Sequence, residues 1–251
     1  AWFNYVQKNY AQFEKNLSSS KSPNEMLGSL VKYFFEQKGQ KVEIVSVMPC
    51  TAKKREILAR GTIDCSITTR ELGELIKLKN IDFNSLEDSK FDDPFGEYSA
   101  GALIFGVTGG VTEAALRYAA FKTTGQKRGL IEDVRYSDGV KETTVDLGGK
   151  KLSLAIVHGL ANAPKVMENI ISGKKKYDFV EVMACPGGCI SGAGQPYLSR
   201  VERMERGKSL YEADRSMSVK RSQDNPLIRE LYNGILKNRN HEMLHVEYKT
   251  K

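Results

Sequence analysis

The sequence lacks a long apolar run, a disulfide-rich cysteine pattern and any interleaving of aromatic with basic residues. No apolar run approaches the roughly 18 residues of a membrane-spanning helix, so no membrane span is expected. Only four cysteines occur in 251 residues. This count does not suggest a disulfide scaffold and fits a reducing compartment. The net charge of +7 is spread along the chain, which indicates a docking surface for an acidic protein and argues against nucleic acid.

Internal repeats and low-complexity linkers are also lacking, and the chain is long enough for one large domain or two small lobes. Residues 80–96 are acidic and turn-rich, so we expect a boundary between lobes there. Hydrophobic periodicity predicts alternating strands and helices. Strands are expected at 41–48, 63–67, 140–147, 150–157 and 178–184, helices at 3–17, 23–34, 69–76, 110–119, 161–171, 209–219 and 226–236, and a polar connection at 197–206.

Local signals refine these elements. Helix 3–17 has one apolar face that includes Val6. Ser22 to Glu25 match a capping box with Pro23 at the first helical position, and the helix that follows is expected to bury Leu27 and Leu30. Thr68 and Glu71 are expected to cap the helix at 69–76, and Gly148-Gly149 predict a hairpin with a primed turn.

The most informative stretch is residues 181–196, where an apolar strand runs into a loop with Cys185, Cys189 and four glycines. Two cysteines at this spacing can point both sulfurs at one inorganic centre. The glycines allow close backbone approach and leave N–H groups to face thiolate or sulfide charge. A disulfide, a zinc site and an iron–sulfur site all remain open from this segment alone.

A second stretch repeats this design, because residues 48–53 read Met-Pro-Cys-Thr-Ala-Lys directly after an apolar strand. Cys50 would be a third thiolate, with Lys53 close behind it. Open α/β sheets place their sites at the ends of parallel strands. Cys65 instead lies inside the predicted strand 63–67, where we expect it to be a small buried hydrophobe.

Two further patterns have competing interpretations. Gly106 to Gly110 lead into a helix but match neither the P-loop nor the dinucleotide pattern, so they indicate either a phosphate cradle or close approach to a bulky cofactor. His241 and His245 match the spacing of a zinc-protease helix. No histidine, aspartate or cysteine follows them as a third ligand, so we expect chance spacing on a docked tail.

Taken together, residues 48–56 and 181–196 resemble the second and third signature motifs of the [FeFe]-hydrogenase catalytic domain. Residues 96–117 are similar to the connecting region of that family, and residues 225–248 resemble its small-subunit tail. The likeness spans essentially the whole chain. The first family motif is Thr-Ser-Cys-Cys-Pro-x-Trp, of which Ala1-Trp2 matches only the last two positions. We therefore expect an upstream segment with the Cys-Cys-Pro sequence as a missing partner.

The resemblance implies an α/β fold of two interleaved lobes, with mostly parallel twisted sheets flanked by helices and a metal cluster between the lobes. Residues 1–94 would form the first lobe with the Met-Pro-Cys motif. Residues 95–206 would form the second lobe with the Cys-x3-Cys motif, and residues 207–251 a helical tail similar to the small subunit.

The resemblance also implies the cofactor and its ligands. Cys50, Cys185, Cys189 and a cysteine of the upstream segment would hold a [4Fe–4S] cubane. Cys189 would bridge it to a diiron subcluster that carries CO, cyanide and a bridging dithiolate, together the H-cluster. Protons would be reduced to H2, or H2 split, with the protein supplying position and electronics. Other sites implied are Lys53 as a donor to cyanide, Met48 and Met183 as sulfur packing, Phe105, Gly106, Gly110 and Pro23 as pocket walls, and Ser18 as a relay serine.

Ferredoxin or ferredoxin-like domains and maturation proteins are the partners that the resemblance implies, in the cytoplasm or, alternatively, the periplasm. Two other functions stay open at this stage. One is a non-catalytic iron–sulfur scaffold or H2 sensor of the same family, although the intact Lys53 and Gly187-Gly188 favour the active class. The other is a zinc-binding interaction module that uses the same three cysteines.

Overall fold

The structure, a computed structural model, describes residues 1–125, 131–135 and 138–246. The chain forms two compact units, and each unit is built from segments that are discontinuous in sequence. Unit 1 comprises Ala1–Ser89, Ala193–Pro196 and Glu230–Lys251, and unit 2 comprises Lys90–Gly192 and Tyr197–Arg229. The predicted boundary at residue 94 lies close to Ser89, whereas residues 207–251 are shared between the units. The two units therefore interleave along the chain.

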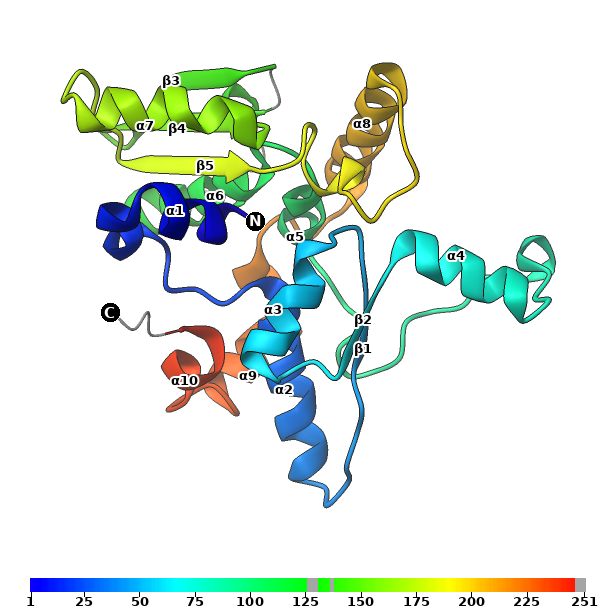
Figure 1. Ribbon diagram of the computed structural model, residues 1–251. Helices are drawn as coiled ribbons and strands as arrows, with labels where there is room; N and C mark the ends of the chain where they lie inside the picture. Colours follow the sequence, from blue (N-terminus) through cyan, green and yellow to red (C-terminus); the bar gives the residue numbers. More distant parts are fainter. Residues whose placement is uncertain (126–130, 136–137, 247–251) are drawn as a thin grey trace. The chain divides into compact units, whose positions relative to one another are not determined.

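Unit 1 contains a two-stranded parallel sheet with helices before, between and after its strands (Figure 1). Its elements are α1 (Trp2–Asn9), α2 (Pro23–Glu36), β1 (Val45–Met48), α3 (Ala52–Arg60), β2 (Cys65–Thr68), α4 (Thr69–Leu78) and α10 (Asn240–Leu244). The strands pair from Val45↔Cys65 to Met48↔Thr68, so Met48 lies at the carboxyl end of the sheet. β1 is shorter than the predicted strand 41–48.

The predicted helix over residues 3–17 is interrupted at Tyr10, whose backbone has φ −146° and ψ 47°. The side-chain amide of Asn9 donates to the Tyr5 carbonyl at 2.9 Å, and such local bonds compete with helix continuation. A 3₁₀ helix, Ala11–Asn16, follows. Val6 is the residue of the predicted apolar face that is fully buried, at 1% exposure.

Helix α2 begins as predicted, with Ser22 as N-cap and Pro23 at its first position. Ser22 Oγ accepts a hydrogen bond from the Glu25 N–H at 3.4 Å. The reciprocal half of the expected capping box is missing, because the buried Glu25 carboxylate has no hydrogen-bond partner in the described part of the chain. The side of α2 that is buried runs through Gly28 and Leu30, so Leu27, predicted to be buried, is 48% exposed.

Helix α4 starts with a complete capping box, as predicted. Thr68 Oγ1 accepts from the Glu71 N–H at 3.2 Å, and the Glu71 carboxylate accepts from the Thr68 N–H at 2.7 Å. A hydrogen bond from Lys54, together with those from Thr68, lowers the pKa of Glu71 to about 2. The carboxylate therefore keeps its charge, and with it the cap, across the neutral and mildly acidic pH range.

Replacing Thr68 by valine is expected to lower the free energy of unfolding of unit 1 by about 1 kcal/mol, because the N-cap acceptor is lost while the side-chain volume is kept. Chemical denaturation followed by circular dichroism measures this change. Thr69→Val, one residue further into the helix, is the matched control, since Thr69 is not part of the box. Equal losses in the two variants would assign the effect to β-branching alone.

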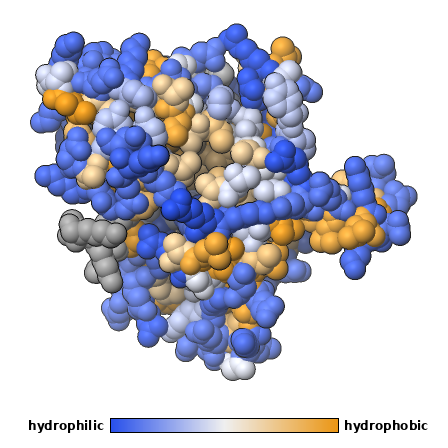
Figure 2. All heavy atoms as spheres, viewed as in Figure 1, coloured by the Kyte–Doolittle hydropathy of each residue, from blue (hydrophilic) through white to orange (hydrophobic). Residues whose placement is uncertain are grey.

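One face of the small sheet in unit 1 is uncovered in the described chain. Val45 and Val47 are 58% and 44% exposed, whereas Ser46 and Ser66 on the opposite face are buried. Cys65 pairs with Val45 and is exposed. The prediction that Cys65 is buried is therefore wrong, because side chains alternate along a strand and Cys65 falls on the uncovered face. Figure 2 shows further apolar surface on the segment around α4, where Leu78 and Phe83 are exposed.

Unit 2 contains a mixed sheet in the order β3-β4-β5. Its elements are α5 (Ala100–Leu103), α6 (Gly110–Thr124), β3 (Val140–Leu147), β4 (Lys150–His158), α7 (Ala163–Ile171), β5 (Phe179–Met183), α8 (Arg200–Ser216) and the first half of α9 (Pro226–Asn233). β3 and β4 form the predicted hairpin, with Gly148 and Gly149 at φ 69° and 90°, as a primed turn requires. β5 joins β4 in parallel.

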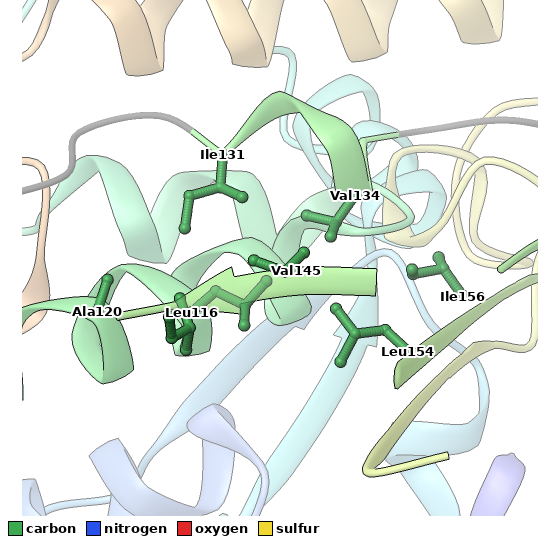
Figure 3. Packing of buried hydrophobic residues seen from close by; sticks show 8 residues of the cluster. Leu116, Ala120, Ile131, Val134, Val145, Leu154 and Ile156 are labelled. Atoms are coloured by element: carbon green, nitrogen blue, oxygen red, sulfur yellow. The ribbon is translucent and has the colours of Figure 1, made fainter. Parts of the chain in front are cut away.

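The core of unit 2 fills both faces of β4. Figure 3 shows one cluster, in which Leu154 and Ile156 of β4 and Val145 of β3 meet Leu116 and Ala120 of α6. Ala155 and Val157, which point the other way, are also buried. Helix α7 contacts β4 and buries Val166 and Met167. A strand covered on both faces is typical of α/β folds, and it gives the residues at its end a rigid support.

A charged cluster lies next to this core. Arg117 and Glu113 of α6 and Asp214 of α8 are each 0% exposed. Arg117 donates to Asp214 at 2.8 Å through both terminal nitrogens and to Glu113 at 2.7 Å. Arg135 pairs with the same two carboxylates. Because each charge is matched by an opposite one, burial of the cluster is tolerated and links α6 to α8.

Two expectations for the C-terminal third need correction or refinement. The polar connection predicted at 197–206 is wrong from residue 200 onward, because Ser199 and Glu202 form a capping box that starts α8. Near the end, Leu244 and Val246 are buried and bond to the segment before α2, through Lys21 N–H to the Leu244 carbonyl and Val246 N–H to the Ser19 carbonyl. In the described chain, no helix is long and apolar enough to cross a membrane.

Candidate metal centre

The cysteine loop of unit 2, residues 184–192, follows directly after β5. Cys185 is half-buried and Cys189 is exposed, and none of the four cysteines of the chain is in a disulfide. The Gly188 N–H donates to the Cys185 carbonyl at 3.0 Å, which closes a tight turn between the two thiols. Both thiols are thus carried by one short turn, as the spacing predicted.

The two glycines of this turn are required by its geometry. Gly187 and Gly188 have φ values of 91° and 94°, which L side chains rarely adopt. A Cβ on Gly188 would also lie 2.7 Å from the Gly106 carbonyl oxygen and 3.0 Å from the Thr108 nitrogen. The loop therefore packs directly onto residues 106–108. The prediction that Gly106 approaches a cofactor stays a prediction.

Glu181 fixes the start of α6 to the cysteine strand. Its carboxylate accepts hydrogen bonds from the N–H groups of Gly109 and Thr112, each at 2.7 Å, and from the Thr112 hydroxyl at 2.6 Å. Burial raises the pKa of Glu181, while these three donors act in the opposite direction. Because the carboxylate already occupies this helix N-terminus, the phosphate cradle considered for Gly106 to Gly110 is excluded. Sequence reasoning did not identify this role of Glu181.

The Met-Pro-Cys motif of unit 1 lies where β1 ends and α3 begins. Cys50 is half-buried there. Gly194 packs on the residues just before Cys50, where its N–H donates to the Pro49 carbonyl at 2.9 Å. The Gly194 carbonyl accepts from the Arg70 N–H at 3.1 Å. A Cβ on Gly194 would lie 3.0 Å from the Met48 carbonyl oxygen. Residues 193–196 therefore belong to unit 1 with the Met-Pro-Cys motif, although Cys189 precedes them closely in sequence and belongs to unit 2.

The other predicted site residues are distributed over both units. Lys53, in the first turn of α3, forms an ion pair with Glu56 and keeps 23% of its side chain exposed. Met48 and Met183 end β1 and β5 and are half-buried. Ser18 is exposed and accepts from the Ser20 N–H at 3.2 Å. Phe105 is half-buried, Gly110 is buried and Pro23 is exposed.

Single-ion metal sites are not formed by the described residues. No three His, Cys, Asp or Glu side chains in that part of the chain are grouped so that they could hold one ion. The rings of His241 and His245 stack with centroids 5.1 Å apart, and His245 Nδ1 lies 2.9 Å from Ser19 Oγ. A [4Fe–4S] cluster does not need such a grouping, since each of its four thiolates binds a different iron. Cys185 and Cys189 of unit 2 and Cys50 of unit 1 carry the thiols that such a cluster takes as ligands.

Comparison with known proteins agrees with these motifs. Residues 1–193 match the family model "Iron only hydrogenase large subunit, C-terminal domain", and residues 200–251 match "Iron hydrogenase small subunit". The NADP-reducing hydrogenase subunit HndD of Solidesulfovibrio fructosivorans is 41% identical over 98% of this chain and 45% of its own length. The periplasmic [Fe] hydrogenase large subunit of Nitratidesulfovibrio vulgaris is 43% identical over 82% of this chain and 52% of its own.

Other relatives carry a different name. Protein NAR1 of Arabidopsis thaliana is 31% identical over 98% of this chain and 59% of its own length, and the probable cytosolic Fe-S cluster assembly factor narfl of Dictyostelium discoideum is 32% identical over 77% of this chain. The chain spans about half the length of the curated hydrogenases that it matches.

The fold agrees as well. A variant of [FeFe]-hydrogenase HydA1 from Chlamydomonas reinhardtii superimposes with a TM-score of 0.83 at 36% identity, covering 98% of this chain and 74% of that one. With both family models matched along almost its entire length, the chain belongs to the iron-only hydrogenase family.

Proposed function

We propose that this chain is the greater part of an [FeFe]-hydrogenase catalytic domain, which interconverts protons and H2 at a diiron centre linked to a [4Fe–4S] cubane. The observation that carries the proposal is the tight turn between Cys185 and Cys189. Two of its residues, Gly187 and Gly188, have positive φ values that favour glycine, and the turn packs onto residues 106–108. The greater identity to hydrogenases, 41% and 43%, than to the probable cytosolic Fe-S cluster assembly factor narfl, 32%, supports the catalytic class.

The ligands of the cubane would be Cys50, Cys185 and Cys189, with the fourth thiolate coming from a Cys-Cys-Pro segment, as in the family pattern. Thiolates suit this role because iron–sulfur clusters are held by cysteine sulfur. Cys189 would also bridge to the diiron unit, whose CO, cyanide and dithiolate ligands are part of the proposal. When bound, the diiron unit supplies an open iron for H2 chemistry.

The remaining residues would position and insulate this centre. Lys53 would hold a cyanide ligand through a charge-assisted hydrogen bond. Met48 and Met183 would pack polarizable sulfur against the diiron unit. Phe105, Gly106, Gly110 and Pro23 would form the walls of the pocket, and Ser18 would pass protons. Electrons would come from ferredoxin or ferredoxin-like domains, insertion of the diiron unit would depend on maturation proteins, and the cysteine content favours the cytoplasm.

Lys53→Ala is expected to leave the cubane in place but to cause loss of the diiron unit, because the cyanide would lose its fixed positive partner. Infrared bands of metal-bound CO and cyanide report the diiron unit, and the iron and sulfide content reports the cubane. Lys54→Ala is the matched control, since Lys54 is the next residue of α3 and pairs with Glu71. Equal damage from the two changes would make the role of Lys53 structural.

A non-catalytic iron–sulfur protein is the second candidate, favoured by the match of 77% of this chain to the probable cytosolic Fe-S cluster assembly factor narfl. The test is the infrared spectrum of the purified, matured protein together with an H2-production assay. The chain alone is expected to be inactive, because its fourth cubane ligand lies in the Cys-Cys-Pro segment. With that segment joined or added as a partner, bands of bound CO and cyanide with H2 turnover are expected from a hydrogenase. Brown iron–sulfur absorption without those bands would assign the chain to the second candidate. A colourless zinc protein would contradict both, and the lack of a three-ligand grouping in the described chain argues against zinc.

A further inference from the structure

His158 ends β4 and lies beside the last residue of the cysteine strand. In the parallel pairing of β4 with β5, His158 is in register with Met183, two residues before Cys185. The residue is only 7% exposed. It therefore stands at the carboxyl end of the sheet, where the cysteine loop begins, and it has been assigned no role so far.

The ring of His158 contacts the middle of the cysteine loop. The Gly187 N–H lies 3.2 Å from both Nδ1 and Nε2 of the ring. The Gly187 carbonyl accepts from the Thr108 N–H at 3.3 Å, and Thr108 Oγ1 lies 3.2 Å from His158 Nδ1. Gly187 is the middle residue between the two cysteines. Both of its main-chain polar groups are thus held by two residues, His158 at the end of β4 and Thr108 just before α6.

The direction of the central hydrogen bond follows from chemistry. A backbone N–H can only donate, so one ring nitrogen of His158 must accept with its lone pair. Either tautomer allows this: the protonated nitrogen then faces Thr108 Oγ1, or the Asp138 carboxylate 3.9 Å from Nε2. Burial lowers the pKa of His158, which favours the neutral ring that this contact needs.

We infer that His158 is a positioning residue for the cysteine loop. First, its ring accepts a hydrogen bond from the Gly187 N–H and thereby fixes the turn that presents Cys185 and Cys189. Second, this bond keeps the Gly187 N–H from donating to cysteine sulfur. The first part stands on the geometry of the chain alone. The second part rests on the proposed iron–sulfur function. Hydrogen bonds to cluster sulfurs are among the factors that set reduction potential, so an N–H withheld by His158 keeps the potential lower than it would otherwise be.

The first test measures amide hydrogen exchange at Gly187 in the metal-free full chain. In His158→Leu and in His158→Phe, which keeps a planar ring, no acceptor remains, and exchange at Gly187 should accelerate about fivefold, as loss of one ordinary hydrogen bond implies. His158→Gln keeps a carbonyl acceptor and should retain most of the protection. His245→Leu, on the tail, is the control. Unchanged exchange in both apolar variants, or equal acceleration in His158→Gln, would overturn the positioning role.

The second test follows the cluster after anaerobic reconstitution with ferrous iron and sulfide. The reduction potential should become more positive in His158→Leu and His158→Phe, because the freed Gly187 N–H can turn to sulfur, and should return toward the wild-type value in His158→Gln. An unshifted potential would overturn the second part alone. If the wild-type chain binds no cluster even when a Cys-Cys-Pro peptide supplies the fourth thiolate, the proposed function fails and the second part fails with it. The exchange measurement still decides the first part.

Discussion

Replacing Cys185 by alanine is expected to abolish iron–sulfur binding and with it all H2 chemistry. The thiol lies at the start of the turn that Gly187 and Gly188 close, and it is not part of a disulfide. No other side chain of the loop can bind iron in its place, so one corner of the cluster would be left open. We expect loss of the brown absorption and of cluster iron and sulfide after anaerobic reconstitution.

The same variant should fold normally, because Cys185 is half-buried and supports no covalent link. An unchanged near-ultraviolet circular dichroism spectrum would establish this. Cys65→Ala is the matched control: Cys65 is exposed on the uncovered face of β2 and should be dispensable for iron binding. A full cluster in the Cys185→Ala variant, or its loss in Cys65→Ala, would contradict the assignment of ligands.

Replacing Arg117 by methionine should destabilise unit 2 by about 3–5 kcal/mol, the usual result of removing one partner from a buried ion pair. Arg117 makes bonds of 2.7–2.8 Å to Glu113 and Asp214, and all three residues are fully buried. Methionine fills much of the volume but leaves the two carboxylates with Arg135 as their remaining cation in the cluster. Denaturant unfolding, followed by a probe in unit 2, measures the loss.

Arg215→Met provides the control for this second change. Arg215 lies on the same helix as Asp214 and pairs with Glu132, but both partners of that pair are about half exposed. Such surface pairs contribute at most about 1 kcal/mol. A cost for Arg117→Met no greater than that for Arg215→Met would show that the buried cluster is replaceable by apolar packing. Such replacement is known for some buried ion pairs when every charged member is exchanged together.

The sequence was most predictive where the signal is local. The hairpin over residues 140–157 was predicted from Gly148-Gly149 and is confirmed, because the primed turn needs two residues at positive φ. The capping box of Thr68 and Glu71 is also confirmed, because both of its hydrogen bonds join residues within one helical turn. The Ser22 cap was half right, since its serine caps but Glu25 points into the interior.

Errors arose where burial depends on neighbours far along the chain. Cys65 and Leu27 were predicted to be buried from their position in apolar patterns, yet both are exposed. Periodicity shows which side chains share a face but not whether another element covers that face. The start of α8 was missed because Ser199 caps, and Glu202 lies in the first turn of, a strongly polar helix that has no clear apolar stripe to announce it.

The sequence by itself determined the family, together with the types and spacing of the proposed ligands, because Cys-x3-Cys with two glycines and Met-Pro-Cys with a nearby lysine are local patterns that chemistry restricts closely. The tertiary structure alone decided what supports them. Three contacts join residues far apart in the sequence. Glu181 binds the start of α6, 69 residues away at Thr112, and Gly194 donates to Pro49 across 145 residues. His158 and Gly187 are brought together by the crossover that joins β4 to β5. Such contacts follow from strand pairing and helix packing, which no local pattern records.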